Sequence, residues 1–209
     1  MTHSQNTPPE KILTAARRLF FQQGFEEVST DLLAKEASVS KTTLYKYFPS
    51  MIAVLRAVVE AEVNVFEHGL PPQVLTREDF ETTLVRYGEN LLHFLNQSDI
   101  IQFAQLMFEE ARFNPDIATV FYAAAYGRTL QDLSKLIQQG IEKGFLRSAL
   151  TADELAEQLL GMWEGFCFIR AQLGLTQKPF EYPQEWSQKC VQTLLNGHAC
   201  LQQPLSPHG

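Results

Sequence analysis

The sequence predicts an all-α protein with two parts, a small N-terminal helical bundle and a larger helical domain. Apolar residues recur at helical spacing along most of the 209 residues, and no useful run alternates with the period of two that a strand requires. Capping residues stand at the start of most periodic segments, and glycine or proline stands at the end of several. With 45% apolar residues, the chain has the composition of a globular protein large enough for one large or two smaller domains.

The first helix is expected at about residues 8–23. Thr7 can cap it, Pro8 fits its first turn, and Glu10 completes a capping box. Gly24 is the expected stop. The helix carries one apolar stripe at positions i, i+3, i+4, i+7 and i+8, formed by Ile12, Ala15, Ala16, Leu19 and Phe20.

Two short helices follow at about 30–37 and 41–47, separated by a tight turn. Thr30 can cap the first of them and Ser40 the second, while Leu44 and Phe48 provide apolar anchors. The outside of the second helix is polar and aromatic, with Lys41, Thr42, Thr43, Tyr45, Lys46 and Tyr47 within seven residues. This pattern is typical of a helix-turn-helix whose second helix is presented to DNA.

The charge distribution agrees with that interpretation. Residues 1–50 hold six Lys and Arg against five Asp and Glu, a balance of +1, whereas the remainder holds eleven against nineteen, a balance of −8. The formal net charge of −7 argues against a protein that coats nucleic acid without regard to sequence. Only the N-terminal part is suited to approach a polyanion.

The rest of the chain has the pattern of helices connected by short loops. A connector helix is expected from Ser50 to about residue 67, followed by a loop at His68–Pro72. Further helices are expected from Thr76, from Ser98, from Asn114 to Lys143, over about 154–173 after a capping box at Thr151, and from Pro183 to about 201. The expected domains are therefore 1–49, with a mobile tail at 1–6, and 50–203, with a second mobile tail at 204–209.

Aromatic residues are frequent in the larger domain. Each one taken alone is best explained as core, but as a group they allow an apolar ligand cavity between helices, with Tyr122, Tyr126 and Gln105 as polar fixtures. We expect a hydrophobic or amphipathic small molecule. The candidate lining residues are Phe66, Phe103, Gln105, Met107, Tyr122, Tyr126, Trp163 and Phe166.

The helix at 154–173 is apolar on more than one side and must be covered on both. One side can face its own domain and the other a second copy of the chain, with Gly161 and Gly165 allowing close approach. The alternative is that the last helix alone covers it within one chain. The candidate dimer residues are Leu160, Cys167, Ala171, Val191, Leu194 and Leu195.

The N-terminal residues resemble a known family. The matching positions are Gly24-Phe25, Thr30, Leu33-Ala34, Ala37, Val39-Ser40-Lys41, Thr43-Leu44-Tyr45 and Tyr47-Phe48-Pro49-Ser50. Over about residues 10–55 this pattern is similar to the TetR family of bacterial transcription regulators. The resemblance implies a DNA-binding domain, a ligand-binding domain, a homodimer on a palindromic double-stranded operator, and repression relieved by a small-molecule effector. A ligand-responsive activator, or a helix-turn-helix used for protein interaction, are the alternatives.

Two positions depart from the family pattern. Ser38 stands in the turn where the family usually has glycine, and a positive φ there would add roughly 1 kcal/mol of strain. Met51 stands where the family usually has a lysine that contacts phosphate.

Other classes of protein find no support in the sequence. The histidines at 3, 68, 93, 198 and 208 are scattered, and no metal, phosphate-loop or nucleophile motif is present, so neither an enzyme nor a cofactor is expected. No signal peptide or membrane span is expected, since even the uncharged stretch Ile117–Gly127 falls short of the roughly 20 apolar residues a span needs. Cys167, Cys190 and Cys200 indicate packed thiols in a reducing cytoplasm, with a redox-sensing pair as the alternative.

Overall fold

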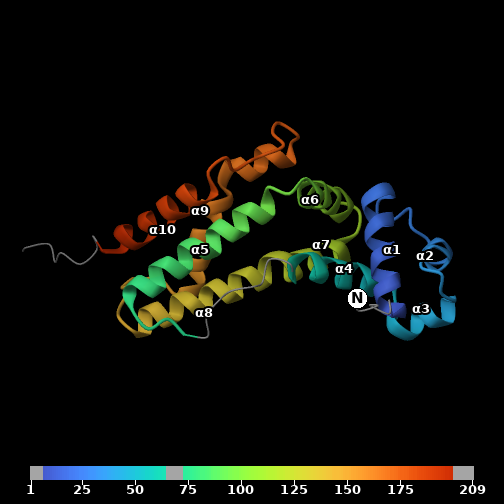
Figure 1. The fold of residues 1–209 in the computed structure, drawn as a ribbon, viewed down its shortest axis with the longest axis horizontal. Helices are drawn as coiled ribbons and strands as arrows, with labels where there is room; N and C mark the ends of the chain where they lie inside the picture. The colour runs from blue at the N-terminus through green and yellow to red at the C-terminus, as the bar shows by residue number, and fades with distance from the viewer. Residues whose placement is uncertain (1–6, 65–72, 200–209) are drawn as a thin grey trace, which may run out of the picture. The chain divides into compact units, whose positions relative to one another are not determined.

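The computed structural model describes residues 7–64 and 73–199, and within these ranges it contains helices and no strand (Figure 1). The predicted all-α class is confirmed. The expected tails, the loop at 68–72, Phe66 and Cys200 lie outside the described residues. The helices are α1 (Pro8–Gln23), α2 (Thr30–Glu36), α3 (Lys41–Tyr47), α4 (Met51–Asn64), α5 (Arg77–Leu95), α6 (Ser98–Ala111), α7 (Pro115–Phe121), the π-helix η1 (Tyr122–Gly127), α8 (Arg128–Glu142), α9 (Ala152–Gln172) and α10 (Pro183–Ala199).

The predicted capping boxes form at the starts of α1 and α9. The Glu10 carboxylate accepts the Thr7 backbone N–H at 2.7 Å, and the Glu154 carboxylate accepts the Thr151 N–H at 2.7 Å. At α5, the Thr76 and Asp79 side chains each accept the other residue's backbone N–H, at 3.0 and 3.1 Å. These contacts satisfy donors that the first helical turn leaves unpaired.

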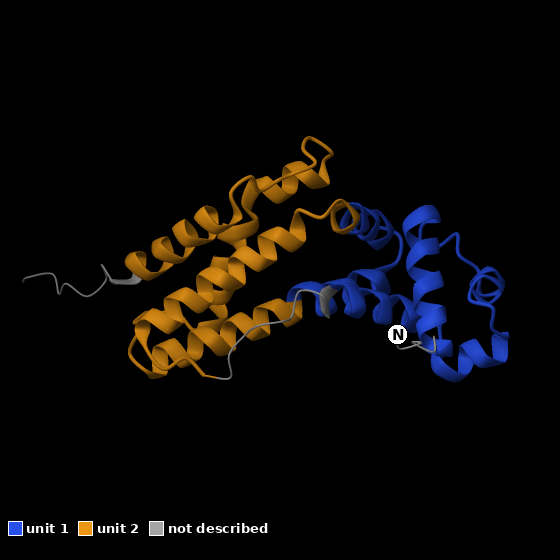
Figure 2. Cartoon of the chain, viewed as in Figure 1, with its two compact units in different colours: residues 1–65, 102–126 blue, residues 66–101, 127–209 orange. Residues whose placement is uncertain are grey.

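The chain packs as two compact units, each of which is built from two separate stretches of the sequence (Figure 2). The first unit comprises residues 1–65 and 102–126, and the second comprises residues 66–101 and 127–209. The division passes through α6 and again at the end of η1. The domain boundary expected after residue 49 stays a prediction, but the first unit shows that α4, most of α6, and α7 pack with the N-terminal bundle.

In the first unit, α1 packs on α2, α3 and α4, and α4 also packs on α7. The small core under α1 contains Ile12, Phe20, Leu33 and Leu44, none of which has measurable exposure. Arg17 of α1 and Glu62 of α4 form a two-pronged ion pair at 2.6 and 3.2 Å. This ion pair supplements the apolar contact between the two helices.

In the second unit, α10 lies against α5 and α9, and α8 lies against α9 and α5. Two helical glycines permit the close contacts. A Cβ on Gly140 would lie 2.4 Å from the Phe80 ring, and one on Gly88 would lie 2.3 Å from both the Trp163 indole and the Ser187 hydroxyl. These contacts seat α8, α9 and α10 on α5.

Two elements differ from the sequence-based expectations. The single helix expected from Asn114 to Lys143 is interrupted by the π-helix η1 between α7 and α8. The helix α9 is broken at Gly165, whose φ of 44° and ψ of −154° are not helical. In both places the apolar pattern of the sequence stays that of a regular α-helix, although the backbone does not.

Candidate nucleic-acid interface

The turn between α2 and α3 is built by local backbone and capping contacts. The Val39 N–H donates to the Ala34 carbonyl at 3.0 Å, and the Ser40 hydroxyl accepts the Thr43 N–H at 3.0 Å. Ser38 has a φ of 54°, so the turn does require the left-handed conformation at the position where this chain lacks glycine. The side chain therefore adds roughly 1 kcal/mol of backbone strain.

The cap of α2 differs from the prediction. Ser29, not Thr30, is the N-cap, and its hydroxyl accepts the Leu32 N–H at 3.2 Å. Thr30 is the first helical residue, and its hydroxyl lies 3.3 Å from the Tyr45 hydroxyl of α3. Thr30 therefore supports a side chain of the candidate interface instead of capping the helix.

The helix α3 has one buried side chain, Leu44, which anchors it under α1. Its other side chains are exposed, apart from the half-buried Thr43. Tyr45 and Tyr47 keep 49% and 41% of their surface exposed, a high value for aromatic residues that have an apolar core beside them. An exposed face of lysines, threonines and tyrosines matches the groups that contact phosphates and base edges.

An ion pair restrains one of these side chains. The Lys41 ammonium lies 2.7 Å from the Asp31 carboxylate of α2. The hydrogen bond to Asp31, and then its charge, raise the pKa of Lys41, so the lysine is cationic across the physiological range. On the same helix, the Lys46 ammonium lies 5.7 Å from the centre of the Tyr47 ring.

The candidate ligand residues fall into both compact units. Phe103, Gln105, Met107, Tyr122 and Tyr126 belong to the first, and Trp163 and Phe166 to the second. In the first unit, Tyr122 stacks on Tyr126 at 5.9 Å, and Phe121 contacts both Phe103 and Tyr126 edge to face. These rings form one connected cluster at the π-helix. Tyr122 is 57% exposed, whereas Phe103 and Met107 are buried.

Trp163 and Phe166 have contrasting environments on α9. Trp163 is fully buried, and within the described residues its indole N–H has no hydrogen-bond partner. Phe166, directly after the break at Gly165, is 75% exposed. The structure thus does not bring Phe166 into the same core environment as Trp163.

Most of the candidate dimer residues are buried within one chain. Leu160, Ala171, Val191, Leu194 and Leu195 are between 1% and 8% exposed, and Cys167 is half-buried. These five residues belong to the core of the second unit, in which α9 packs against both α8 and α10. Which surface joins two copies of the chain stays a prediction.

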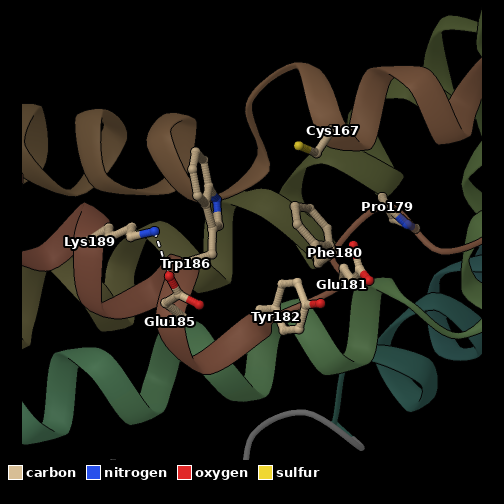
Figure 3. Close-up of a pocket in the computed structure, with 8 residues that line it drawn as sticks. All are labelled: Cys167, Pro179, Phe180, Glu181, Tyr182, Glu185, Trp186 and Lys189. Atoms are coloured by element: carbon tan, nitrogen blue, oxygen red, sulfur yellow. Dashed lines mark hydrogen bonds and ion pairs between the residues drawn. The ribbon is translucent and has the colours of Figure 1, made fainter.

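The exposed apolar face at the end of α9 lies elsewhere, on residues that the sequence pattern did not select for the dimer. Phe166, Ile169 and Leu173 are 75%, 51% and 69% exposed. Beside them is a half-open pocket of about 160 Å³, lined by Cys167, Pro179, Phe180, Glu181, Tyr182, Glu185, Trp186 and Lys189 (Figure 3). This volume is below the several hundred Å³ of a typical small-molecule site, so the pocket is too small to be the expected ligand cavity.

Two acidic residues were missed by sequence reasoning. Glu164 of α9 is half-buried, and burial raises the pKa of its carboxyl to about 7. Glu110 of α6 accepts the Phe25 backbone N–H at 2.9 Å. Only the helical position of Glu164, four residues from Leu160 and Phe168, could have signalled its burial; nothing in the sequence pairs Glu110 with Phe25.

Two family descriptions match the chain. Residues 12–58 match "Bacterial regulatory proteins, tetR family", and residues 82–197 match "AefR-like transcriptional repressor, C-terminal domain".

None of the helices in the described ranges has the length and apolarity that a bilayer crossing requires.

Related proteins agree with this assignment. The HTH-type transcriptional regulator EthR of Mycolicibacterium smegmatis is 27% identical over 148 residues, 71% of this chain and 67% of that protein. The solved structure of the flavonoid-responsive regulator FrrA superposes with a TM-score of 0.74 at 25% identity, covering 95% of this chain and 98% of that one. A TetR regulator from Agrobacterium tumefaciens shares the fold with a TM-score of 0.75 at 21% identity, covering 92% and 95% of the two chains.

Because a single family description spans more than half of the chain and a second one covers the helix-turn-helix, the protein belongs to the TetR family and is a DNA-binding transcriptional regulator, not an enzyme.

Proposed function

We propose that the chain is a homodimeric, cytoplasmic repressor that binds a palindromic operator through α3 and leaves it when a hydrophobic or amphipathic small molecule binds. The observation that carries the DNA half is the exposed face of α3, on which every side chain but Leu44 and the half-buried Thr43 faces solvent. A short helix anchored by a single leucine leaves its polar side free for the major groove.

The α3 side chains divide by chemistry into base-reading and positioning groups. Thr42 and Thr43 offer a methyl group for thymine and a hydroxyl for either base edge. Lys41 and Lys46 neutralise phosphates or reach a guanine edge. Hydroxyl contacts from Thr30, Ser40, Tyr45 and Tyr47 to the backbone fix the register.

A second copy of the chain is the proposed partner of the exposed apolar face of α9. Ile169 and Phe166 are large apolar side chains with more than half of their surface exposed, and Trp186 of α10 is 39% exposed. A two-fold dimer places two α3 helices on successive turns of the DNA, about 34–36 Å apart. Such a dimer accounts for a palindromic site.

The proposed effector is aromatic or amphipathic. The cluster of Phe103, Phe121, Tyr122 and Tyr126 at the π-helix provides stacking surfaces, and π-helical turns occur often at functional sites. In the second unit, the buried Trp163 indole N–H is a separate candidate donor. The similarity to FrrA, named as flavonoid-responsive, supports flat aromatic compounds as the first class to test.

The effector would act by favouring one helix arrangement over another. The helix α4 packs on α1 and α7 and follows directly after the recognition helix, so a shift of α4 moves α3. The coupling is reciprocal, and operator DNA should weaken effector binding by the same factor by which the effector weakens DNA binding. A flavonoid that binds tightly without changing operator affinity would rule out this scheme for that compound class.

Selection from random duplexes tests the DNA half because it requires no chosen operator sequence. The full-length protein should enrich an inverted repeat with half-sites one helical turn apart. With that operator, Lys41→Ala should weaken binding and reduce the slope of log K against log salt by about 1, because one phosphate contact is lost. Lys143→Ala is the matched control, since it removes an exposed lysine from the second unit. Failure to enrich any sequence would reject the proposed function.

A further inference from the structure

We propose that Glu110 of α6 is a positioning residue for DNA recognition, because it fixes the loop between α1 and α2 and thereby the orientation of the helix-turn-helix. This role gives the DNA-binding helices a second, non-covalent attachment besides the covalent one through α4. The proposal rests on the proposed function of α3, which supplies the DNA contact being oriented.

The contact begins with a backbone group that has no helical partner. Gly24 closes α1 by donating its N–H to the Phe20 carbonyl, and the chain then leaves the helix at Phe25. The Phe25 side chain is 7% exposed and packs against the Phe20 ring at 5.3 Å, so its N–H lies at the edge of the core. A backbone donor in such a place needs an acceptor. The Glu110 carboxylate, 85 residues away in sequence, accepts it at 2.9 Å.

Glycine at position 24 makes room for this carboxylate. A Cβ on Gly24 would lie 2.8 Å from the Glu110 Oε1 atom, closer than side-chain carbons approach an oxygen. The φ of 88° at Gly24 is also one that other residues rarely adopt. The local backbone and the carboxylate thus fit each other, as expected for a specific contact.

Two further contacts lie on either side of the Glu110 bond within the same compact unit. Phe103, two helical turns earlier in α6, stacks on Phe21 of α1 with ring centres 4.7 Å apart and planes within 2° of parallel. Asn114, at the start of α7, donates its amide N–H to the Glu26 carboxylate at 3.0 Å. Three contacts of different chemistry therefore join α6 and α7 to the end of α1 and the loop that follows it. Residues 102–126 and the N-terminal helices belong to the same compact unit (Figure 2).

These contacts imply a route for regulation that does not depend on α4. Phe103 belongs both to the stack on α1 and to the aromatic cluster at the π-helix, through its edge-to-face contact with Phe121. An effector that displaces this cluster changes the position of α6 relative to α1. Glu110 then carries the displacement to the helix-turn-helix through the Phe25 N–H. A helix-turn-helix held in one orientation also loses less freedom on binding DNA, so the attachment favours tight operator binding.

The test compares Glu110 with its neighbour Glu109, whose exposed carboxylate makes no ion pair or hydrogen bond with the described part of the chain. Glu110→Ala should lower operator affinity roughly tenfold or more, the effect of losing one charge-assisted hydrogen bond. The salt slope should stay that of the wild type, because no phosphate contact is lost. Glu110→Gln keeps an acceptor oxygen and should recover most of the affinity, and Glu109→Ala should match the wild type.

Hydrogen exchange at the Phe25 amide is the second measurement, made on the same full-length variants. Exchange should speed up in Glu110→Ala and stay slow in Glu109→Ala. Wild-type operator affinity in Glu110→Ala, or an unchanged exchange rate, overturns the inference even when the operator itself has been found. If Glu110→Ala fails to fold, Glu110→Gln is compared with Gly24→Val, a variant that disrupts the same loop. Operator binding by Glu110→Gln that is no tighter than binding by Gly24→Val would also overturn the inference. The absence of any selected operator is a different result, which rejects the proposed function instead.

Discussion

At the scale of single residues, Glu164 links burial to the pH dependence of stability. Burial raises its pKa to about 7, whereas in the unfolded chain it titrates near 4.5. The folded state therefore binds the proton more tightly, so the contribution of this group is most favourable at low pH and is lost as the pH rises through about 7. Replacement by glutamine removes that loss. The advantage of Glu164→Gln in unfolding free energy should grow by about 2 kcal/mol between pH 5.5 and 8.5.

Urea denaturation at the two pH values measures this difference. Glu157→Gln is the matched control, because Glu157 lies on the same helix with an exposed side chain. Its unfolding free energy relative to the wild type should not change with pH in the same way. Equal pH profiles for the two variants would mean that Glu164 is solvated in the folded protein.

Residues whose environment has a local cause could be predicted from the sequence, and Glu164 is not one of them. The caps at Thr7, Ser40 and Thr151 were predicted because a capping side chain and its backbone partner lie within three residues. The positive φ at Ser38 could be anticipated from the missing glycine of the family pattern. Glu164, like Glu110, has an environment made by segments distant in sequence, which a local pattern does not contain.

At the scale of elements, most helices could be predicted and their irregularities could not. Periodic apolar positions and caps predict the approximate bounds of α1 and α3 and the starts of α5 and α10. The π-helix falls in Tyr122–Gly127, where small residues leave the side-chain pattern compatible with an ordinary helix. The rings of Phe121, Tyr122 and Tyr126 contact one another at this π-helix, and a one-dimensional pattern does not contain such contacts.

The break in α9 gives a prediction about this helix. Gly165 combines a φ of 44° with a ψ of −154°, a conformation open essentially to glycine alone. Nothing within 4 Å would obstruct an added Cβ, so the backbone and not space is the constraint. Gly165→Ala should therefore destabilise the protein by about 1–3 kcal/mol in urea denaturation.

Gly197→Ala provides the comparison, because Gly197 lies in helical α10, also with open space around its Cβ position. Alanine there should be neutral or stabilise by up to about 1 kcal/mol. A Gly165→Ala variant as stable as Gly197→Ala would show that α9 tolerates a continuous helix.

At the scale of the whole molecule, the sequence predicted a DNA-binding part and a larger helical part but not how the chain is shared between compact units. Residues 102–126 pack with the N-terminal helices although they lie far along the chain. Besides the packing of α7 on α4, Phe103, Glu110 and Asn114 contact the N-terminal segment, and these three residues have no common sequence signature. The periodicity of α9 also could not say which of its apolar sides would be buried within the chain.

That choice of side leads to the prediction for the dimer. Because Leu160 and Ala171 are buried within the chain, the exposed side with Ile169 is the one left for a second copy. A carboxylate in the apolar centre of an interface would be buried without a partner, at a cost of at least several kcal/mol. Ile169→Asp should therefore shift the protein to monomers in sedimentation velocity at micromolar concentration. Operator affinity should fall by about 100-fold or more, because two linked half-site contacts become independent.

Leu75→Asp is the control for added charge on an exposed apolar residue. Leu75 is 70% exposed and precedes α5, far from α9 in sequence and outside any helix. The Leu75→Asp substitution should leave both the sedimentation coefficient and the operator affinity unchanged. If Ile169→Asp stays dimeric while Leu75→Asp dissociates, the dimer uses another surface. If both stay dimeric but Ile169→Asp loses operator affinity, this side of α9 acts on DNA binding without forming the contact between copies.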